Sequence, residues 1–394
     1  MPAITHEPIG RAREFAGIEV PTSLQLDAAL ERALARIDRA LPQFTDSFPA
    51  PSSVELVYPP IGNIEWTNGF WTGMLWLAWE ITGEARYRRA AEIQVQSFVE
   101  RADRAIGVTH HDMGFLYTLS ACAAWRLTGA SEARRAGLAA ATFLLNRFDP
   151  KSGVIQAWGD LSDPEQAGRM IIDCNLNLPL LYWASEQTGH LEFKRAAERH
   201  LTQAARYLVR PDASTFHTFH MDTRTGNPLH GTTHQGFSDD SCWARGQAWG
   251  IYGFALGYAH SGREDLVALA SSLANYFLNR LPEDMVCRWD LIFVDGEEPR
   301  DTSAAAIAAC GLLELNRHLP ISDPARDIYA RAAWGIVKAL DRSYLASLDG
   351  SNGLLADGVY HIPKGIGVSE CCIWGDYFYL EALVRMRRIW SPYW

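Results

Sequence analysis

Two aspartates lie in sequence settings that suit acid–base chemistry. Asp112 follows two histidines in HHDMGF (110–115), and Asp173 lies among apolar residues in IIDCNLN (171–177). An apolar setting raises the pKa of a carboxyl group, so we expect a raised pKa for Asp173. Two carboxyl groups that face one site are the usual equipment for glycoside chemistry.

These aspartates also have a simpler interpretation. They belong to a set of four aspartates that each precede an expected helix, where a carboxylate commonly accepts N-terminal backbone N–H bonds as an N-cap: Asp112, Asp173, Asp301 and Asp376. We assign the cap role to Asp301 and Asp376. We predict that Asp112 and Asp173 face a functional site.

Arg245 lies in WARGQAW (243–249), at the expected start of a buried helix. Its guanidinium fork could grip an anionic substrate, and the structural alternative is a cap or an ion pair with Asp239 or Asp240.

The chain contains 14 Trp residues, more flat aromatic surface than a core needs. Several could stack on sugar faces, although some must belong to the core: Trp66, Trp71, Trp158, Trp243 and Trp249.

A metal site is the alternative use for a group of histidines in the 211–242 segment, which are His217, His220, His230 and His234. No HExxH motif, paired metal-ligand spacing or CxxC pair accompanies them, so we predict no metal and no other cofactor. The sequence also lacks GxGxxG before a helix, GxxxxGK[ST] and GxSxG. Their absence disfavours nucleotide binding and serine-esterase chemistry.

A repeat supplies the elements that must position these residues. Each unit has an apolar run, a Gly turn and a basic amphipathic run, in 73–92, 115–141, 176–200 and 250–272. The turn glycines, Gly83, Gly129, Gly189 and Gly262, fall where a helix end favours positive φ. Two further apolar runs, 302–315 and 375–386, continue the series without that turn.

The repeat predicts pairs of one inner and one outer helix. A run that is apolar on every side is buried all round, whereas the amphipathic run has one wet face. Six inner helices are expected to begin near 69, 114, 175, 244, 302 and 375, and the segment 24–41 supplies the missing outer helix. The pairs then close into an all-α (α/α)6 toroid. The alternative is an open α-solenoid that binds proteins.

The longest irregular stretches, 150–172, 211–242, 282–300 and 346–371, each run from an outer helix to the next inner one. They therefore share one end of the toroid, and the polar and aromatic residues before the inner helices meet there in one crater. We find no linker. The chain is predicted to form a single domain over 1–394, with a short N-terminal arm at about 1–20.

Composition excludes several other classes. With 36 Lys+Arg against 46 Asp+Glu among 394 residues, the net charge of −10 would repel nucleic acid. No uncharged apolar run reaches the roughly 18 residues of a membrane span, and no signal peptide is recognisable. Seven scattered cysteines without a CxxC pair favour a reduced compartment. We expect a soluble cytoplasmic protein, as a monomer or a weak homo-oligomer.

As a set, the junction motifs resemble the unsaturated glucuronyl hydrolases of glycoside hydrolase family 88. The matching stretches cover nearly the whole chain beyond the first ~20 residues, at 66–83, 110–121, 171–189, 234–254 and 372–383. The resemblance implies an (α/α)6 barrel. It also implies an enzyme that removes a 4,5-unsaturated uronic acid from the non-reducing end of lyase-generated oligosaccharides, by hydrating the enol-ether double bond.

By this resemblance Asp173 corresponds to the acid/base residue of the family and Asp112 to its second required aspartate. Its substrate-contacting positions correspond to Trp66, His111, Trp158, His217, Gln235, Arg245 and Trp249. Arg245 and Gln235 are then expected to contact the uronate carboxylate. The segment HIPKGIGVSE (361–370) is expected to line the region beyond the unsaturated sugar, with Lys364 and Ser369 in place of a Ser/Lys-rich pattern that suits sulfated fragments.

Other functions stay open at this point. A sister family with the same barrel acts on unsaturated rhamnogalacturonyl sugars and has a segment closer to W-x-R-G-N-G-W, so RGQAW favours the glucuronyl branch. A sugar epimerase or polysaccharide lyase would use the toroid with His or Tyr bases. A non-enzymatic helical scaffold would bind carbohydrate or protein without turnover.

Overall fold

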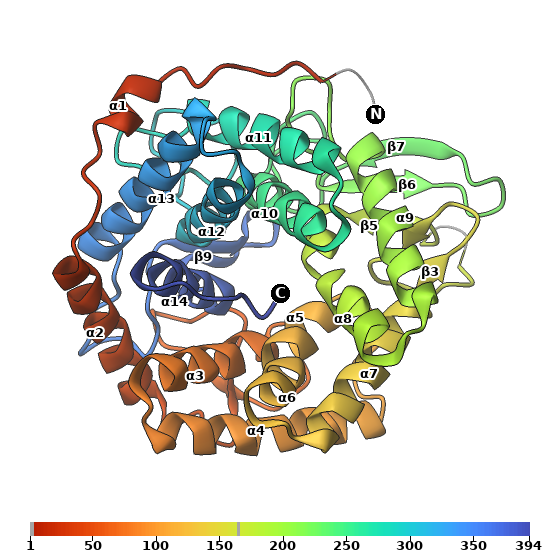
Figure 1. The fold of residues 1–394 in the computed structure, drawn as a ribbon, viewed down its shortest axis with the longest axis horizontal. Helices are drawn as coiled ribbons and strands as arrows, with labels where there is room; N and C mark the ends of the chain where they lie inside the picture. Colours follow the sequence, from red (N-terminus) through yellow and green to blue (C-terminus); the bar gives the residue numbers. More distant parts are fainter. Residues whose placement is uncertain (1–3, 164–165) are drawn as a thin grey trace.

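The computed structural model describes residues 4–163 and 166–394, and helices dominate it (Figure 1). The helices are α1 (Ala12–Ala16), α2 (Ser23–Ala40), α3 (Asn68–Thr82), α4 (Ala85–Asp103), α5 (Met113–Tyr117), α6 (Ala123–Thr128), α7 (Ser131–Leu145), α8 (Pro179–Thr188), α9 (Leu191–Tyr207), α10 (Ala244–Ser261), α11 (Glu264–Asn279), α12 (Thr302–His318), α13 (Pro324–Ser343) and α14 (Ile373–Arg387). The strands are β1 (Phe48–Pro49), β2 (Pro60–Ile61), β3 (Phe148–Asp149), β4 (Val154–Ile155), β5 (Arg169–Ile171), β6 (Thr218–Met221), β7 (Pro228–Thr232), β8 (Gly358–His361) and β9 (Ile366–Glu370).

The inner helices form a closed ring, and an outer helix covers each of them (Figure 1). Around the ring, α3 packs on α5, α8 follows, and then come α10, α12 and α14, which packs back on α3. The outer layer is α4, α7, α9, α11 and α13, and α2 from the N-terminal region completes it by packing on α14. The (α/α)6 toroid is therefore confirmed, and the open solenoid is excluded.

The sequence periods explain the two layers. Helix α10 is buried without interruption from Ala244 to Gly257, because it is apolar or small on every side. Helix α9 buries one face and leaves charged residues in solvent. The four turn glycines end their helices in the left-handed conformation, with φ between 71° at Gly83 and 75° at Gly189. A residue with a Cβ is strained there, which explains Gly at each turn.

Two inner helices differ from the continuous helices that the sequence predicts. The second is interrupted by a π-helical turn at Thr118–Cys122, between α5 and α6. The third opens with a 3₁₀ turn at Ile172–Leu176, and α8 begins only at Pro179, whose missing N–H suits a first helical position. The 3₁₀ turn contains Asp173, and the π-helical turn follows the short helix α5 that begins directly after Asp112.

The long connections also contain short antiparallel strands where we expected irregular chain. Strands β5, β6 and β7 form one three-stranded sheet, and β8 pairs with β9. Strands of two to five residues are too short to show an alternating pattern, so the sequence alone does not reveal them.

The N-terminal segment lies along the outer layer. Glu7 forms an ion pair with Arg280, Arg11 donates to the Leu281 carbonyl, and α1 packs on α13. Residues 1–3 of the expected arm lie outside the described residues, and the arm with its domain boundary stays a prediction.

All seven cysteines are buried and free. Within residues 4–163 and 166–394, no helix is both long and apolar enough to cross a membrane.

The close approach of α3 to α5 depends on Gly69. A Cβ at Gly69 would lie 2.0 Å from the backbone oxygen of Phe115, which cannot move aside without shifting the inner ring. We expect Gly69→Ala to lower the free energy of unfolding by about 3 kcal/mol or more in urea titrations. The control Gly62→Ala, where no atom lies within 4 Å of the new Cβ, should change it by less than about 0.5 kcal/mol. Equal stability of the two variants would contradict this packing.

Candidate active site

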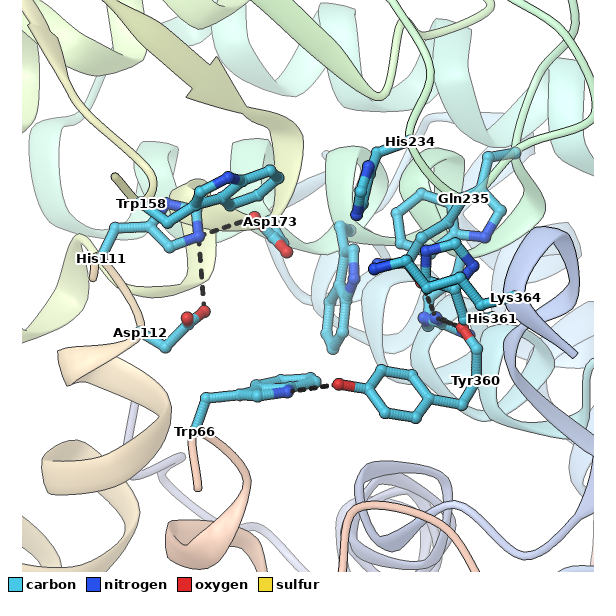
Figure 2. A pocket seen from close by; sticks show the side chains of 13 residues that line it. Trp66, His111, Asp112, Trp158, Asp173, His234, Gln235, Tyr360, His361 and Lys364 are labelled. Atoms are coloured by element: carbon cyan, nitrogen blue, oxygen red, sulfur yellow. Dashed lines mark hydrogen bonds and ion pairs between the residues drawn. The ribbon is translucent and has the colours of Figure 1, made fainter. Parts of the chain in front are cut away.

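One cavity of about 210 Å³ lies at the crater formed by the junctions before the inner helices (Figure 2). Its volume falls below the roughly 300–1,000 Å³ of pockets for drug-sized ligands, so it fits a single sugar ring. Its lining comes from segments far apart in the sequence: Trp66, His111, Asp112, Trp158, Asp173, His234, Gln235, Trp243, Arg245, Trp249, Tyr360, His361 and Lys364.

Asp112 and Asp173 face each other across the ring of His111 (Figure 2). The His111 Nε2 atom lies 3.4 Å from Asp112 Oδ1 and 3.3 Å from Asp173 Oδ1. The imidazole is 2% exposed, and the two carboxyl side chains are 14% and 16% exposed. His110 Nδ1 adds a contact of 3.0 Å to the other oxygen of Asp112. The three groups therefore form one coupled acid–base unit with an opening toward the cavity.

The surroundings drive the pKa values of the two aspartates apart. Burial, followed by the charge of Asp112, raises the pKa of Asp173 well above its usual value, against a weaker opposing effect of Arg245. Burial also raises the pKa of Asp112, but the adjacent His111 and His110 outweigh it, so that this pKa is lowered. Burial lowers the pKa of His111 to about 4. These opposite shifts favour the protonated form of Asp173 and the charged form of Asp112, beside a neutral imidazole.

Arg245 is held by four hydrogen bonds within the protein. Nη1 donates to Asp301 Oδ2 at 3.0 Å and to the Val359 carbonyl, and Nη2 donates to the Tyr360 carbonyl at 2.8 Å. Nη2 also donates to Gln235 Oε1 at 2.6 Å. The guanidinium thus connects the buried N-cap carboxylate of α12, the strand β8 and the loop that carries Gln235.

This bonding sets the orientation of Gln235. A guanidinium can only donate, so the amide atom facing Arg245 must be the oxygen. The Gln235 nitrogen is then the free donor at the cavity wall. An amide nitrogen held there, next to a guanidinium, suits a carboxylate ligand.

Aromatic rings form the floor and walls. Trp66 stacks on Trp374 with centroids 5.3 Å apart, and its Nε1 donates to Tyr360 Oη at 3.1 Å (Figure 2). Trp158 packs against His234 at 5.4 Å, with the guanidinium of Arg169 over its ring at 4.9 Å. Such flat faces are suited to the apolar face of a pyranose.

The structure brings eight of the nine predicted site residues to the cavity: Asp112, Asp173, Trp66, His111, Trp158, Gln235, Arg245 and Trp249. His217 is placed behind the wall. It is 3% exposed, its Nδ1 accepts the backbone N–H groups of His234 and Gln235 at 2.8 and 3.2 Å, and its ring packs on Trp243. Its position indicates that it supports the loop, while the functional roles of all nine residues stay predictions.

Sequence reasoning missed Tyr360 in the cavity wall, and it placed His361 only in the segment 361–370 that we expected beyond the first sugar. Tyr360 directly precedes that segment, so the signal was its proximity. Trp71, in contrast, is 2% exposed and donates to the Phe44 carbonyl, and it belongs to the core.

Of the two cap assignments, one is confirmed and one is wrong, and Arg245 forms an ion pair with a different aspartate from those considered. Asp301 caps α12 as predicted, accepting from the N–H groups of Ser303 and Ala304. Asp376 is no N-cap: it lies inside α14 and accepts from the backbone of the 354–355 loop and from Tyr58. Arg245 pairs with Asp301, not with Asp239 or Asp240, because Asp301 approaches from the neighbouring inner helix.

The comparison with known families decides the class of the protein. The family model for Glycosyl Hydrolase Family 88 matches residues 36–350. The chain belongs to this family. It is therefore a glycoside hydrolase, and the paired carboxyl groups lie in the cavity of an enzyme.

Individual relatives match this hydrolase over nearly its full length. An unsaturated chondroitin disaccharide hydrolase of Streptococcus pneumoniae is 44% identical over 393 residues, covering 99% of each chain. The unsaturated glucuronyl hydrolase of Bacillus sp. (strain GL1) is 48% identical over 370 residues, covering 93% of this chain and 98% of its own. The crystal structure of unsaturated glucuronyl hydrolase from Streptococcus agalactiae superposes with a TM-score of 0.98 at 43% identity, covering 100% of both chains.

His111, Asp112 and Asp173 offer ligand atoms that could hold a cation. One ligand atom each from His111, Asp112 and Asp173 lie within 4.8 Å of one another, which is close enough for a shared ion. Whether the enzyme needs an ion is decided by activity in chelator.

The hydrogen bonds of Arg245 generate a stability prediction. Arg245→Met leaves the buried Asp301 without its counter-ion, which should lower the free energy of unfolding by about 3–5 kcal/mol. Arg245→Lys keeps the charge but loses the fork, so we expect a smaller loss and a raised KM. As a control, Arg104→Met removes only an exposed i,i+4 pair with Glu100 and should cost less than about 1 kcal/mol. Full stability of Arg245→Met would disprove the assigned bonding.

Proposed function

We propose that this enzyme removes a 4,5-unsaturated uronic acid from the non-reducing end of oligosaccharides, by hydrating the double bond of that sugar. The observation that carries the proposal is the cluster of Asp112, His111 and Asp173, in which burial and the charge of Asp112 raise the pKa of Asp173. Addition of a proton to a carbon–carbon double bond requires such an acid at working pH.

The first step is protonation of carbon. Asp173 donates its proton to C4 of the enol ether, the π electrons form the C4–H bond, and positive charge develops at C5 and the ring oxygen. The charged Asp112, within the same unit, can bind ring hydroxyls and orient the sugar. The free amide nitrogen of Gln235, beside Arg245, is placed to receive the uronate carboxylate.

Water completes the reaction. It adds to C5, and the Asp173 carboxylate takes up its proton, which regenerates the acid. The product is a hemiketal that opens to a C5 ketone, and the hemiacetal left at C1 then releases the remaining oligosaccharide as an alcohol. One water is consumed in total, and the glycosidic bond breaks without protonation of its oxygen by a second acid.

The relatives suggest which substrates to test first. Three streptococcal relatives are named unsaturated chondroitin disaccharide hydrolases, and a variant of the Streptococcus agalactiae enzyme was crystallised with dGlcA-GalNAc6S. A further neighbour was crystallised with dGlcA-Glc-Rha-Glc. We therefore expect activity on unsaturated glycosaminoglycan disaccharides, with tolerance for the neighbouring sugar.

The cellular setting belongs to the same proposal. The seven free cysteines fit a reducing cytoplasm. We expect the enzyme to act as a monomer or a weak homo-oligomer.

The reaction can be followed by the ultraviolet absorbance of the conjugated double bond. We expect the enzyme to bleach a panel of lyase-generated disaccharides and to leave the matching saturated glycosides intact, since these offer no double bond to protonate. Activity should persist in chelator. Equal cleavage of saturated glycosides would indicate an ordinary glycosidase, and loss of activity in chelator would indicate a metal at His111, Asp112 and Asp173.

Heavy water distinguishes carbon protonation from oxygen protonation. When the reaction runs in deuterium oxide, the released keto acid should carry one deuterium at C4, detected by mass spectrometry and NMR. As a control for exchange, keto acid formed in ordinary water is incubated with the enzyme in deuterium oxide. A product without deuterium at C4 would rule out the proposed first step.

Asp173→Asn tests the acid itself. The amide keeps the shape but delivers no proton, so kcat should fall by about 10²–10⁴-fold or more while substrate binding and melting temperature stay close to wild type. Asp265→Asn, which removes a partly exposed carboxylate paired with Arg263 at the start of outer helix α11, is the matched control and should keep wild-type kcat. Wild-type turnover by Asp173→Asn would end this assignment.

A further inference from the structure

A second buried histidine lies behind the acid–base unit. His200, on the inner face of α9, has no exposed surface, and its Nδ1 accepts the backbone N–H of Ile155 at 2.8 Å. A nitrogen that accepts cannot carry the proton, so neutral His200 must carry it on Nε2. That Nε2–H is buried and has no partner among the described residues.

The buried ring of His111 also has one nitrogen without a partner among the described residues. Its Nδ1 is buried and unpartnered within the described part of the chain, whereas its Nε2 lies between the two aspartates. A buried polar nitrogen without a partner is costly, so both orphan nitrogens call for a hydrogen bond.

The backbone around Ile155 places the two rings on the same side. The N–H of Ile155 holds His200, and the carbonyl of Ala157 accepts the backbone N–H of His111 at 2.8 Å. Gln156 lies between these two residues and faces the opposite edge. Its N–H donates to the Arg147 carbonyl, and its own carbonyl accepts from Arg147 Nε. Along an extended chain, residues two apart share an edge, so His200 and His111 approach the same edge of this segment.

We propose that His200 is a positioning residue that fixes the tautomer of His111: His200 Nε2–H donates to one bridging water, which donates to His111 Nδ1 and thereby keeps the His111 proton on Nε2. The consequence rests on the proposed function. The Nε2–H of His111 then lies between the two carboxyl groups, 3.3 Å from Asp173 Oδ1 and 3.4 Å from Asp112 Oδ1, so that Nε2 offers no lone pair to the acid proton of Asp173.

The opposite tautomer would defeat the acid. With its proton on Nδ1, His111 would present a lone pair at Nε2, which would accept the Asp173 proton and turn it away from the sugar. The choice between the two tautomers of His111 is made between neutral forms. Burial lowers the pKa of His111 to about 4, and burial, with His111 nearby, lowers that of His200 to about 3. Both rings are neutral above these values, and only the position of each proton remains to be set.

Ring nitrogen NMR of the substrate-free enzyme reads the tautomer directly. With histidine labelled at both ring nitrogens, and His111 assigned by loss of its signals in His111→Gln, we expect a protonated Nε2 and an unprotonated Nδ1 at pH 7. A protonated Nδ1, or rapid exchange between the two tautomers, would overturn the proposal. Because no substrate is present, this result stands apart from any failure of the proposed reaction.

Two variants of His200 separate the donor from the structural contact. His200→Asn retains an acceptor for the Ile155 N–H but removes the Nε2 donor, whereas His200→Gln restores a donor near that position. We expect His200→Asn to mix the His111 tautomers and to lower kcat by about 10–100-fold with little change in KM, and His200→Gln to recover part of the loss.

The control is His260→Asn. His260 is another histidine whose pKa burial lowers to about 4, but it stacks on Tyr182 away from the cavity. It should keep wild-type kcat. If His200→Asn keeps wild-type kcat and an unchanged His111 signature, the positioning role is wrong. If it fails to fold, the wild-type NMR measurement still decides the proposal.

Discussion

The active site depends on one constraint: two carboxyl groups that share a single buried imidazole cannot both be charged. Their nearest oxygens lie 3.3 and 3.4 Å from His111 Nε2, and little solvent reaches either group. His111 and His110 lower the pKa of Asp112, whereas burial and the charge of Asp112 raise the pKa of Asp173. The enzyme thus obtains an acid at neutral pH from the repulsion and burial of its own carboxyl groups, without an additional proton source.

The ring supplies the burial, and further buried carboxylates hold the loops around it. Asp301 holds Arg245, which in turn orients Gln235 and ties down strand β8. Asp290 accepts from Phe237, Ser241 and Cys242 and so fixes the other end of the same loop. These carboxylates are fully buried and each is hydrogen-bonded several times, which is the condition under which buried charge is tolerated. Buried aspartates therefore hold both ends of the loop that carries Gln235.

Much of this arrangement was predictable from the sequence. The helix pairs follow from the change between all-apolar and amphipathic runs, and ring closure follows from the unpaired segment that became α2. Asp301 was predictable as a cap because that role depends only on local backbone. The partners of Arg245 and Asp376 were not, because they come from other segments, residues 301 and 359–360 for the first and 354–355 for the second. The 3₁₀ turn around Asp173 and the role of His200 likewise depend on tertiary contacts that leave no periodic trace.

The protonation state of Asp173 is the central claim, and infrared difference spectroscopy measures it. The spectrum of wild type minus Asp173→Asn should show the carbonyl band of a protonated, buried carboxyl group at pH 7. A raised pKa means that the acid form persists below that pKa and is lost only as the pH rises through it, so the band should weaken on alkaline titration. Absence of the band at pH 7, with its appearance only below about pH 4, would show that Asp173 is an ordinary carboxylate and would contradict the account.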